Sequence, residues 1–275
     1  MPQILDGPLG TQLEARGVDT RLPLWSARAL LEAPDQVAAI HRDYVRAGAT
    51  LHTANTFRTK RRTLGASWEK LAREAVAIAR RTVPEEHQVL GSIAPLEDCY
   101  RPDLSPEDPT LEHRELAEVL ADAGVDVLLC ETFPHVGEAL AAIQQCVATG
   151  VTTWVAFTAG PHANLLTPEQ MAEAAHRAVD AGAAAVLVNC VPATATLPFV
   201  KALAPVGVPV GAYANAGQVD DAIGWRPPTE AAVGAYLDLT RAWHEAGATI
   251  LGSCCGTGPD HIAALARWAA GLASK

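Results

Sequence analysis

Three cysteines could form one reactive site although they lie far apart in the sequence. Cys190 follows one apolar run, and the adjacent pair Cys254 and Cys255 follows another. Three thiolates suit Zn²⁺, which coordinates cysteine sulfur at about 2.3 Å in a tetrahedron and, with three protein ligands, keeps a fourth position open for chemistry. The alternative is that these cysteines are buried as small hydrophobic residues, the usual environment of a free cysteine.

The adjacent cysteines can share one ion only if the chain bends at them. On a regular strand, neighbouring side chains point to opposite faces of the sheet. Gly252 and Gly256 flank Cys254 and Cys255, and glycine permits the backbone conformations of a sharp bend. The spacing is therefore compatible with a shared metal site.

Other polar residues give weaker indications of chemistry. Cys130 is expected in the core of a strand, Cys146 in the core of a helix, and Cys99 is not assigned to the site. His52 is expected to pack on a strand, and His261 on a helix face. The histidines form no H-x-H or H-E-x-x-H motif and no serine lies in G-x-S-x-G, which argues against the common metal and serine hydrolases.

A basic segment contains Arg58, Lys60, Arg61 and Arg62. It could bind an anion near the site. A solvated turn is the favoured interpretation, because runs of charge usually lie on the surface.

A repeated strand–helix unit must position these residues. Amphipathic helical patterns separate eight short apolar runs, and one of them repeats apolar side chains at helical spacing from Val37 to Val45. Ala-Gly pairs end four helices, where glycine can adopt a left-handed cap; these are Gly48, Gly124, Gly182 and Gly247. The predicted strands are Gln3–Leu5, Ala49–Ala54, Gln88–Ile93, Val125–Cys130, Thr153–Phe157, Ala184–Val188, Pro209–Ala212 and Thr249–Gly252.

Eight such units in 275 residues predict an α/β fold, a single-domain (β/α)8 TIM barrel over residues 1–275. The nucleotide motifs G-x-G-x-x-G and G-x-x-x-x-G-K-[ST] of open sheets are missing. Segment Asp98–Pro109 is predicted as a long loop after the third strand. Chemistry in such a barrel lies at the carboxyl ends of the strands, so the three cysteines are expected to converge on one rim.

Composition excludes several classes of protein. Apolar residues make up 49% of the chain, which is typical of a globular core. A net charge of −10 argues against a nucleic-acid partner, and no apolar run approaches the roughly 20 residues that span a bilayer. Six cysteines, two of them adjacent, fit a reducing compartment. We therefore expect a cytoplasmic protein without a membrane partner. The sequence makes no prediction about its oligomeric state.

Several motifs together resemble the homocysteine S-methyltransferase family, over nearly the whole chain. They are LDGPLGTQLEARGVD, LWSARAL, RAGATLHTANTFRT, GSIAP, ADAGVDVLLCETFP, VLVNC, YANAG and GATILGSCCGTGPDHI. The Asn-Cys after the sixth strand with the Cys-Cys-Gly-Thr after the eighth is the most specific part. The resemblance implies a zinc-binding (β/α)8 barrel in which Cys190, Cys254 and Cys255 are the zinc ligands and act catalytically through the bound ion.

The resemblance also implies how the amino-acid part of homocysteine is held. Asp6 with Gly7, and Glu131, match positions that bind it: a carboxylate can pair with the ammonium, and backbone N–H groups beside a glycine can meet the carboxylate. An ordinary capping or ion-pair role is the alternative for Asp6 and Glu131.

Four further residues complete the predicted substrate site. Asn189 is expected to support Cys190 or to line the pocket. Trp25 and Ser26 fall in a segment that closes over the substrate in family members. Asn55, at the end of the second strand, is predicted to contact substrate.

The implied reaction is zinc-dependent methyl transfer from a sulfonium, S-methylmethionine or S-adenosylmethionine, to the thiol of homocysteine, giving methionine. Ser253 stands where family members often have a second glycine, and the 97–110 loop is shorter and more acidic than expected, so its role stays open. The alternatives are another thiol acceptor, a methyl-corrinoid or folate donor, or a zinc or redox sensor without turnover. The pocket signature at Asp6 and Glu131 speaks against a sensor.

Overall fold

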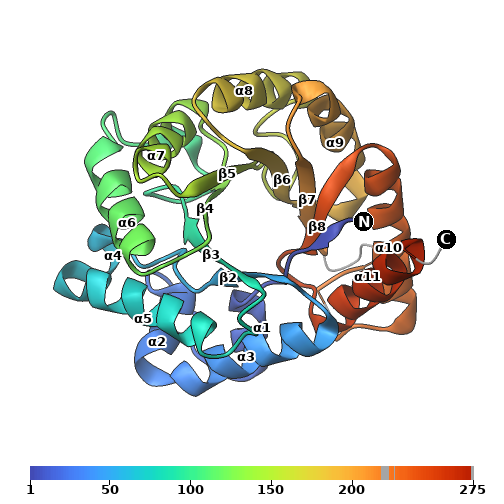
Figure 1. Cartoon of the computed structure of the whole chain (residues 1–275), viewed down its shortest axis with the longest axis horizontal. Helices are drawn as coiled ribbons and strands as arrows, with labels where there is room; N and C mark the ends of the chain where they lie inside the picture. Colours follow the sequence, from blue (N-terminus) through green and yellow to red (C-terminus); the bar gives the residue numbers. More distant parts are fainter. Residues whose placement is uncertain (218–222, 226, 274–275) are drawn as a thin grey trace.

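Eight parallel strands form a barrel at the centre of the molecule, with helices outside it (Figure 1). The computed structural model describes residues 1–217, 223–225 and 227–273. The strands are β1 (Gln3–Ile4), β2 (Leu51–Ala54), β3 (Gln88–Ile93), β4 (Val127–Phe133), β5 (Thr152–Phe157), β6 (Ala185–Pro192), β7 (Val210–Asn215) and β8 (Ala248–Ser253). Sheet order runs β1-β8-β7-β6-β5-β4-β3-β2, and a bridge between Leu5 and Leu51 joins β1 to β2. The predicted (β/α)8 barrel is confirmed.

The helices cover the outer face of the barrel. They are α1 (Gly10–Ala15), α2 (Arg28–Glu32), α3 (Pro34–Ala47), α4 (Arg61–Leu64), α5 (Trp68–Arg80), α6 (Thr110–Asp122), α7 (Val136–Ala148), α8 (Pro168–Asp180), α9 (Leu197–Leu203), α10 (Glu230–Glu245) and α11 (Pro259–Leu272). None of these helices, within the residues described, is both long and apolar enough to cross a membrane.

Local sequence signals explain where the helices pack and end. Val37, Ile40 and Tyr44 form the buried stripe of α3, as their helical spacing predicts. All four glycines of the Ala-Gly pairs have left-handed backbone angles, with φ of 94°, 83°, 103° and 115° in chain order. Each glycine therefore lets the chain reverse from a helix into the next strand without steric cost.

Three strands run at least three residues further than their hydrophobic runs predict. The predicted ends at Cys130, Val188 and Ala212 are wrong, because β4 continues to Phe133, β6 to Pro192 and β7 to Asn215. Pairing resumes after a shift of register between Cys130 and Phe133 and another between Asn189 and Pro192. A β-bulge of this kind re-aims side chains at the end of a strand, and periodicity alone does not reveal it.

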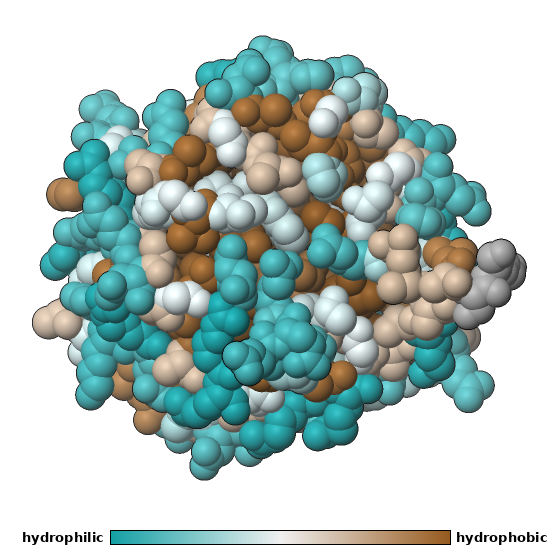
Figure 2. Space-filling view, in the orientation of Figure 1, coloured by the Kyte–Doolittle hydropathy of each residue, from teal (hydrophilic) through white to brown (hydrophobic). Residues whose placement is uncertain are grey.

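Apolar side chains form two layers. A large cluster lies between the helices and the outer face of the sheet, and a smaller one fills the barrel interior with side chains such as Leu90, Leu129 and Leu187. Figure 2 shows hydrophobic residues across the upper and central part of the viewed face, and hydrophilic residues around its edge and over its lower middle. The interior is thus packed, as in barrels of this size, and the cavity described below lies beyond it.

Tyr236 connects α10 to two strands at the base of the cysteine pair. Its buried hydroxyl accepts a hydrogen bond from the Ala214 amide (3.2 Å) and lies 2.9 Å from the Gly252 carbonyl oxygen, to which it donates. The ring packs edge-on against Trp243 at 5.5 Å between centroids. The same side chain therefore fixes β7, β8 and α10 together.

We expect Tyr236→Phe to lower the free energy of unfolding by about 1–3 kcal/mol, because the ring packing stays while the buried Ala214 amide loses its partner. Urea denaturation followed by circular dichroism measures this. An unchanged free energy of unfolding would show that the hydroxyl does not hold the strands.

Candidate metal centre and substrate pocket

A cavity of about 590 Å³ opens at the carboxyl ends of the strands. This is the size and place expected for a small-molecule site in a barrel. Most of the predicted site residues line it, namely Asp6, Gly7, Trp25, Ser26, Asn55, Glu131, Cys190, Cys254 and Cys255. Asn189 does not.

Three cysteine sulfurs converge on one side of this cavity. The Sγ atoms of Cys190 and Cys254 lie 2.6 Å apart, and those of Cys254 and Cys255 3.9 Å apart. All three sulfurs lie within 4.8 Å of one another, and none forms a disulfide. The convergence expected from the strand ends is therefore present.

The chain turns at the adjacent pair because β8 ends at Ser253. The Cys254 amide donates to the Ala214 carbonyl (2.8 Å), and the Cys255 carbonyl accepts from the Ala216 amide (2.9 Å). Gly256 has φ 81°, the left-handed conformation that such a turn needs. The role expected of Gly252 is wrong: its φ is not left-handed, and an added Cβ would lie 2.8 Å from that of Leu5, so this glycine provides close packing against β1.

A bulge and a buried amide aim Cys190. The residue has φ 51°, as Thr132 has φ 65° at the matching bulge of β4. Asn189 joins the two bulges: it donates to the Thr132 hydroxyl (2.7 Å) and to the Cys190 sulfur (3.6 Å), and accepts from the Thr132 amide (3.2 Å). A positive φ destabilises a β-branched residue such as Thr132 by about 1–3 kcal/mol. Such a conformation persists only where the surrounding structure imposes it. Of the two predicted roles of Asn189, the structure shows the contact with Cys190.

The three thiols fit a soft divalent cation. Sulfurs at 2.3 Å from an ion would lie about 3.8 Å apart, which matches the pair Cys254–Cys255, while Cys190 and Cys254 would separate. Hydrogen bonds from its two neighbours lower the pKa of Cys255, whereas the contact with Cys190 raises the pKa of Cys254. Three thiolates require a positive ion, and cysteine sulfur favours zinc among the common ones.

Two buried carboxyl groups lie across the cavity. Asp6 accepts a hydrogen bond from the Thr53 amide (2.9 Å). Glu131 accepts from the hydroxyl groups of Ser92 and Tyr213, the second at 2.9 Å. Burial raises the pKa of both carboxyl groups, so a cationic ligand would stabilise their charged forms. Sequence reasoning did not assign Ser92 or Tyr213, although GSIAP and YANAG place them at strand ends.

Uncharged histidines lie behind Asp6. Donor atoms of Asp6, His41 and His52 lie within 4.8 Å of one another, and His52 Nε2 is 3.0 Å from His87 Nδ1. Burial lowers the pKa of His41 to about 4 and that of His52 to about 3. Both rings are therefore neutral near pH 7 and leave the charge of Asp6 uncompensated. His52 packs within the fold as predicted.

Gly7 lets β1 approach the cavity floor closely. An added Cβ would lie 2.7 Å from the Tyr44 hydroxyl oxygen and 2.8 Å from Ser253 Oγ. Contacts this short do not occur for real Cβ atoms, so any larger residue would displace the cavity wall.

The N-terminal segment is fastened over the cavity. Asn55 donates to the Ser26 carbonyl (2.8 Å), and the Trp25 ring meets that of Phe57 edge-on at 5.5 Å. An added Cβ on Gly10 would lie 2.3 Å from the Trp25 ring, so glycine is needed where the indole rests on α1. Asn55 thus both lines the cavity and holds the segment that contains Trp25 and Ser26.

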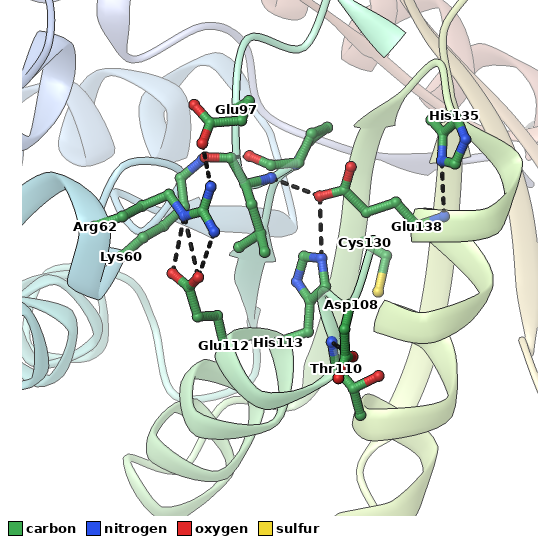
Figure 3. A network of polar contacts seen from close by, with 12 residues as sticks. Lys60, Arg62, Glu97, Asp108, Thr110, Glu112, His113, Cys130, His135 and Glu138 are labelled. Atoms are coloured by element: carbon green, nitrogen blue, oxygen red, sulfur yellow. Dashed lines mark hydrogen bonds and ion pairs between the residues drawn. The ribbon is translucent and has the colours of Figure 1, made fainter. Parts of the chain in front are cut away.

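A buried polar network fixes the start of the loop after β3 (Figure 3). Lys60, only 2% exposed, donates to the carbonyls of Pro95 and Leu96, and Glu138 accepts from the Leu96 amide (2.7 Å) and contacts His113 Nε2 (3.3 Å). The loop is therefore anchored before it reaches the cavity, which it lines with Asp98, Cys99 and Tyr100.

One expectation from the sequence needs correction here. The basic segment is not a solvated turn: Lys60 is buried in this network, Arg58 lines the cavity, and Arg61 and Arg62 form exposed ion pairs. Cys99 lines the cavity but, as expected, lies outside the group of three convergent sulfurs. Residue type and spacing do not show which member of a charged run faces inward.

Comparison with known proteins gives full-length matches. The homocysteine S-methyltransferase family model matches residues 3–269. The chain is 31% identical to homocysteine S-methyltransferase YbgG of Bacillus subtilis, covering 98% of this chain and 95% of that protein. It is 33% identical to homocysteine S-methyltransferase of Escherichia coli, and the match covers 95% of this chain and 93% of that protein. Among solved structures, the metallated form of homocysteine methyltransferase MmuM from Escherichia coli superimposes with a TM-score of 0.79 at 26% identity. The superposition covers 97% of this chain and 96% of that one.

Proposed function

The chain belongs to the homocysteine S-methyltransferase family, and from this premise we propose that it moves a methyl group from a sulfonium donor to the thiol of homocysteine, giving methionine. The observation that carries the proposal is the convergence of three cysteine thiols beside two buried carboxyl groups in one cavity. The metal is zinc, held by Cys190, Cys254 and Cys255. The absence of disulfides among the six cysteines is consistent with a reducing compartment, and we place the protein in the cytoplasm.

Homocysteine is bound through opposite charges at the cavity floor. Its ammonium group pairs with Asp6 and Glu131, whose buried carboxylates have no cationic partner among the described residues. Backbone N–H groups beside Gly7 receive its carboxylate. The neutral histidines behind Asp6 keep this attraction undiminished. The amino-acid part is thereby held while the thiol reaches the cysteines.

The acceptor thiol must lose its proton before it can attack. A free thiol, with a pKa near 8.5, is only a few per cent thiolate at neutral pH. When bound, zinc supplies the positive charge that keeps a thiol deprotonated. The three cysteine thiolates carry more negative charge than one divalent ion neutralises, so the acceptor sulfur stays electron-rich. Asn189 and Thr132 hold Cys190 in place for this role.

Methyl transfer is then a single displacement. The acceptor sulfur forms a bond to the methyl carbon while the bond from that carbon to the donor sulfur breaks, and the electron pair stays on the donor as a neutral thioether. The protein contributes proximity and alignment. Carboxylates and thiolates in the cavity attract a cationic donor, and the aromatic residues Trp25 and Phe57, which favour a nearby cation, line the same cavity.

We expect the zinc-loaded protein to transfer labelled methyl from S-methylmethionine to homocysteine, read as labelled methionine. Cys190→Ser removes one of the three thiolates and should abolish transfer, whereas Cys146→Ala, which alters a buried cysteine of the helix layer, should leave most of it. Transfer that survives Cys190→Ser would contradict the role of the three cysteines. Label that moves only from a methyl-corrinoid or a methylated folate would overturn the sulfonium assignment.

We expect kcat/KM for homocysteine to fall as the pH is lowered, and the midpoint of this fall should lie above the pKa of an ordinary carboxyl group. Burial raises the pKa of Asp6 and Glu131, so both take up protons, and lose attraction for the ammonium, sooner as the pH falls. Asp6→Asn should lower kcat/KM about 10- to 100-fold by removing a charged hydrogen bond.

The matched control is Asp238→Asn, which alters a carboxylate that is 73% exposed and should leave the pH profile unchanged. If Asp6→Asn keeps the wild-type kcat/KM and the wild-type midpoint of its pH dependence, the ammonium group of homocysteine does not pair with this carboxylate.

A further inference from the structure

Arg58 lines the substrate cavity and forms an ion pair with no anion among the residues that the structure describes. It is the only positively charged side chain among the described residues that line the cavity. Its Nε atom is buried without a hydrogen-bond partner, and no described carboxylate forms an ion pair with it. The neighbouring Arg61 and Arg62 instead pair with glutamates on α6. A guanidinium left in this state has hydrogen-bonding capacity that a ligand can satisfy.

The surroundings of Arg58 differ from those of the cavity floor. Its guanidinium carbon lies 5.7 Å from the centroid of the Phe57 ring, which in turn meets Trp25 edge-on. The Asp98 carboxylate lines the same cavity but accepts from the Tyr100 amide (2.9 Å) and forms no ion pair with Arg58. Arg58 therefore belongs to a wall that it forms with Phe57 and Trp25, and it pairs with neither Asp6 nor Glu131 at the floor.

The charges of two amino-acid substrates can be matched to these two regions. The acceptor needs its ammonium at Asp6 and Glu131 and its sulfur at the cysteines, which assigns it to the floor. The carboxylate of the acceptor takes the backbone N–H groups beside Gly7, so a second carboxylate at the floor would meet carboxylates and thiolates and be repelled. The second substrate must present a cationic methyl group to the acceptor sulfur, and aromatic faces favour such a cation. The negative end of that substrate has one cationic partner among the described lining residues, Arg58.

We propose that Arg58 forms an anion subsite that binds the carboxylate of the methyl donor, so that the donor is a carboxylate-bearing sulfonium. This inference rests on the proposed function and specifies its second substrate. A guanidinium can bind a carboxylate through two parallel hydrogen bonds, and its two terminal nitrogens provide such a fork. The subsite orients the donor by its two ends, with the sulfonium toward the cysteines and the carboxylate toward Arg58.

The test compares S-methylmethionine with its methyl ester, which keeps the sulfonium and the ammonium but lacks the negative charge. Calorimetry on the zinc-loaded protein measures the Kd of each compound without turnover. The wild type should bind the acid about 10- to 100-fold more tightly than the ester, the value of a charged hydrogen-bonded pair. Arg58→Ala should raise the Kd of the acid by that factor and leave the Kd of the ester unchanged. Arg58→Lys should retain part of the preference for the acid.

Two controls locate the effect. Arg61→Ala removes a neighbouring cation that is paired with Glu115 on the surface, and it should leave both Kd values unchanged. The affinity for homocysteine should stay within about twofold in Arg58→Ala, because its charges are assigned to the floor. A loss of homocysteine affinity with an unaltered donor Kd would overturn the proposal, as would equal binding of acid and ester by the wild type.

The outcomes separate this inference from the proposed reaction. A preference for the acid that disappears in Arg58→Ala supports the subsite even where no labelled methionine is formed, and the reaction assignment alone then fails. Normal transfer from S-methylmethionine with no preference for the acid overturns the subsite and leaves the reaction intact.

Discussion

Three thiols held within 4.8 Å of one another are the constraint on which the rest of the site depends. Thiolates repel each other, and the chain itself offers them one cation in the whole cavity wall that is described, Arg58. Their convergence is therefore imposed by the barrel. The bulge of β6 aims Cys190, the turn after β8 presents the other two, and Asn189 fastens the first to Thr132 of β4.

Electrostatic separation organises the remainder of the cavity. Its floor carries buried carboxyl groups whose neighbours are hydroxyls, amides and neutral imidazoles, so that no positive charge of the described residues there competes with an incoming cation. One wall carries aromatic rings and Arg58 instead. The arrangement that we propose places the amino-acid acceptor at the floor and the onium donor against the wall, with sulfur facing sulfur near the cysteines.

Much of this architecture can be predicted from the sequence, for identifiable reasons. Strand–helix alternation and glycine caps specify the barrel, and the barrel specifies that Cys190 and Cys254 meet, because strand ends share one rim. The bulge at Thr132 could not be predicted, since it interrupts no hydrophobic pattern. The burial of Lys60 was also missed: it depends on carbonyls of a loop that is distant in sequence, and a charged side chain gives no local sign of such partners.

X-ray absorption at the zinc edge tests the central claim most directly. On the zinc-loaded protein, the first shell should contain three sulfurs at about 2.3 Å and one lighter atom. Addition of homocysteine should replace the lighter atom with a fourth sulfur at the same distance. A shell with fewer than three sulfurs, or one that homocysteine leaves unchanged, would contradict an account in which three cysteines present an open position to the acceptor thiol.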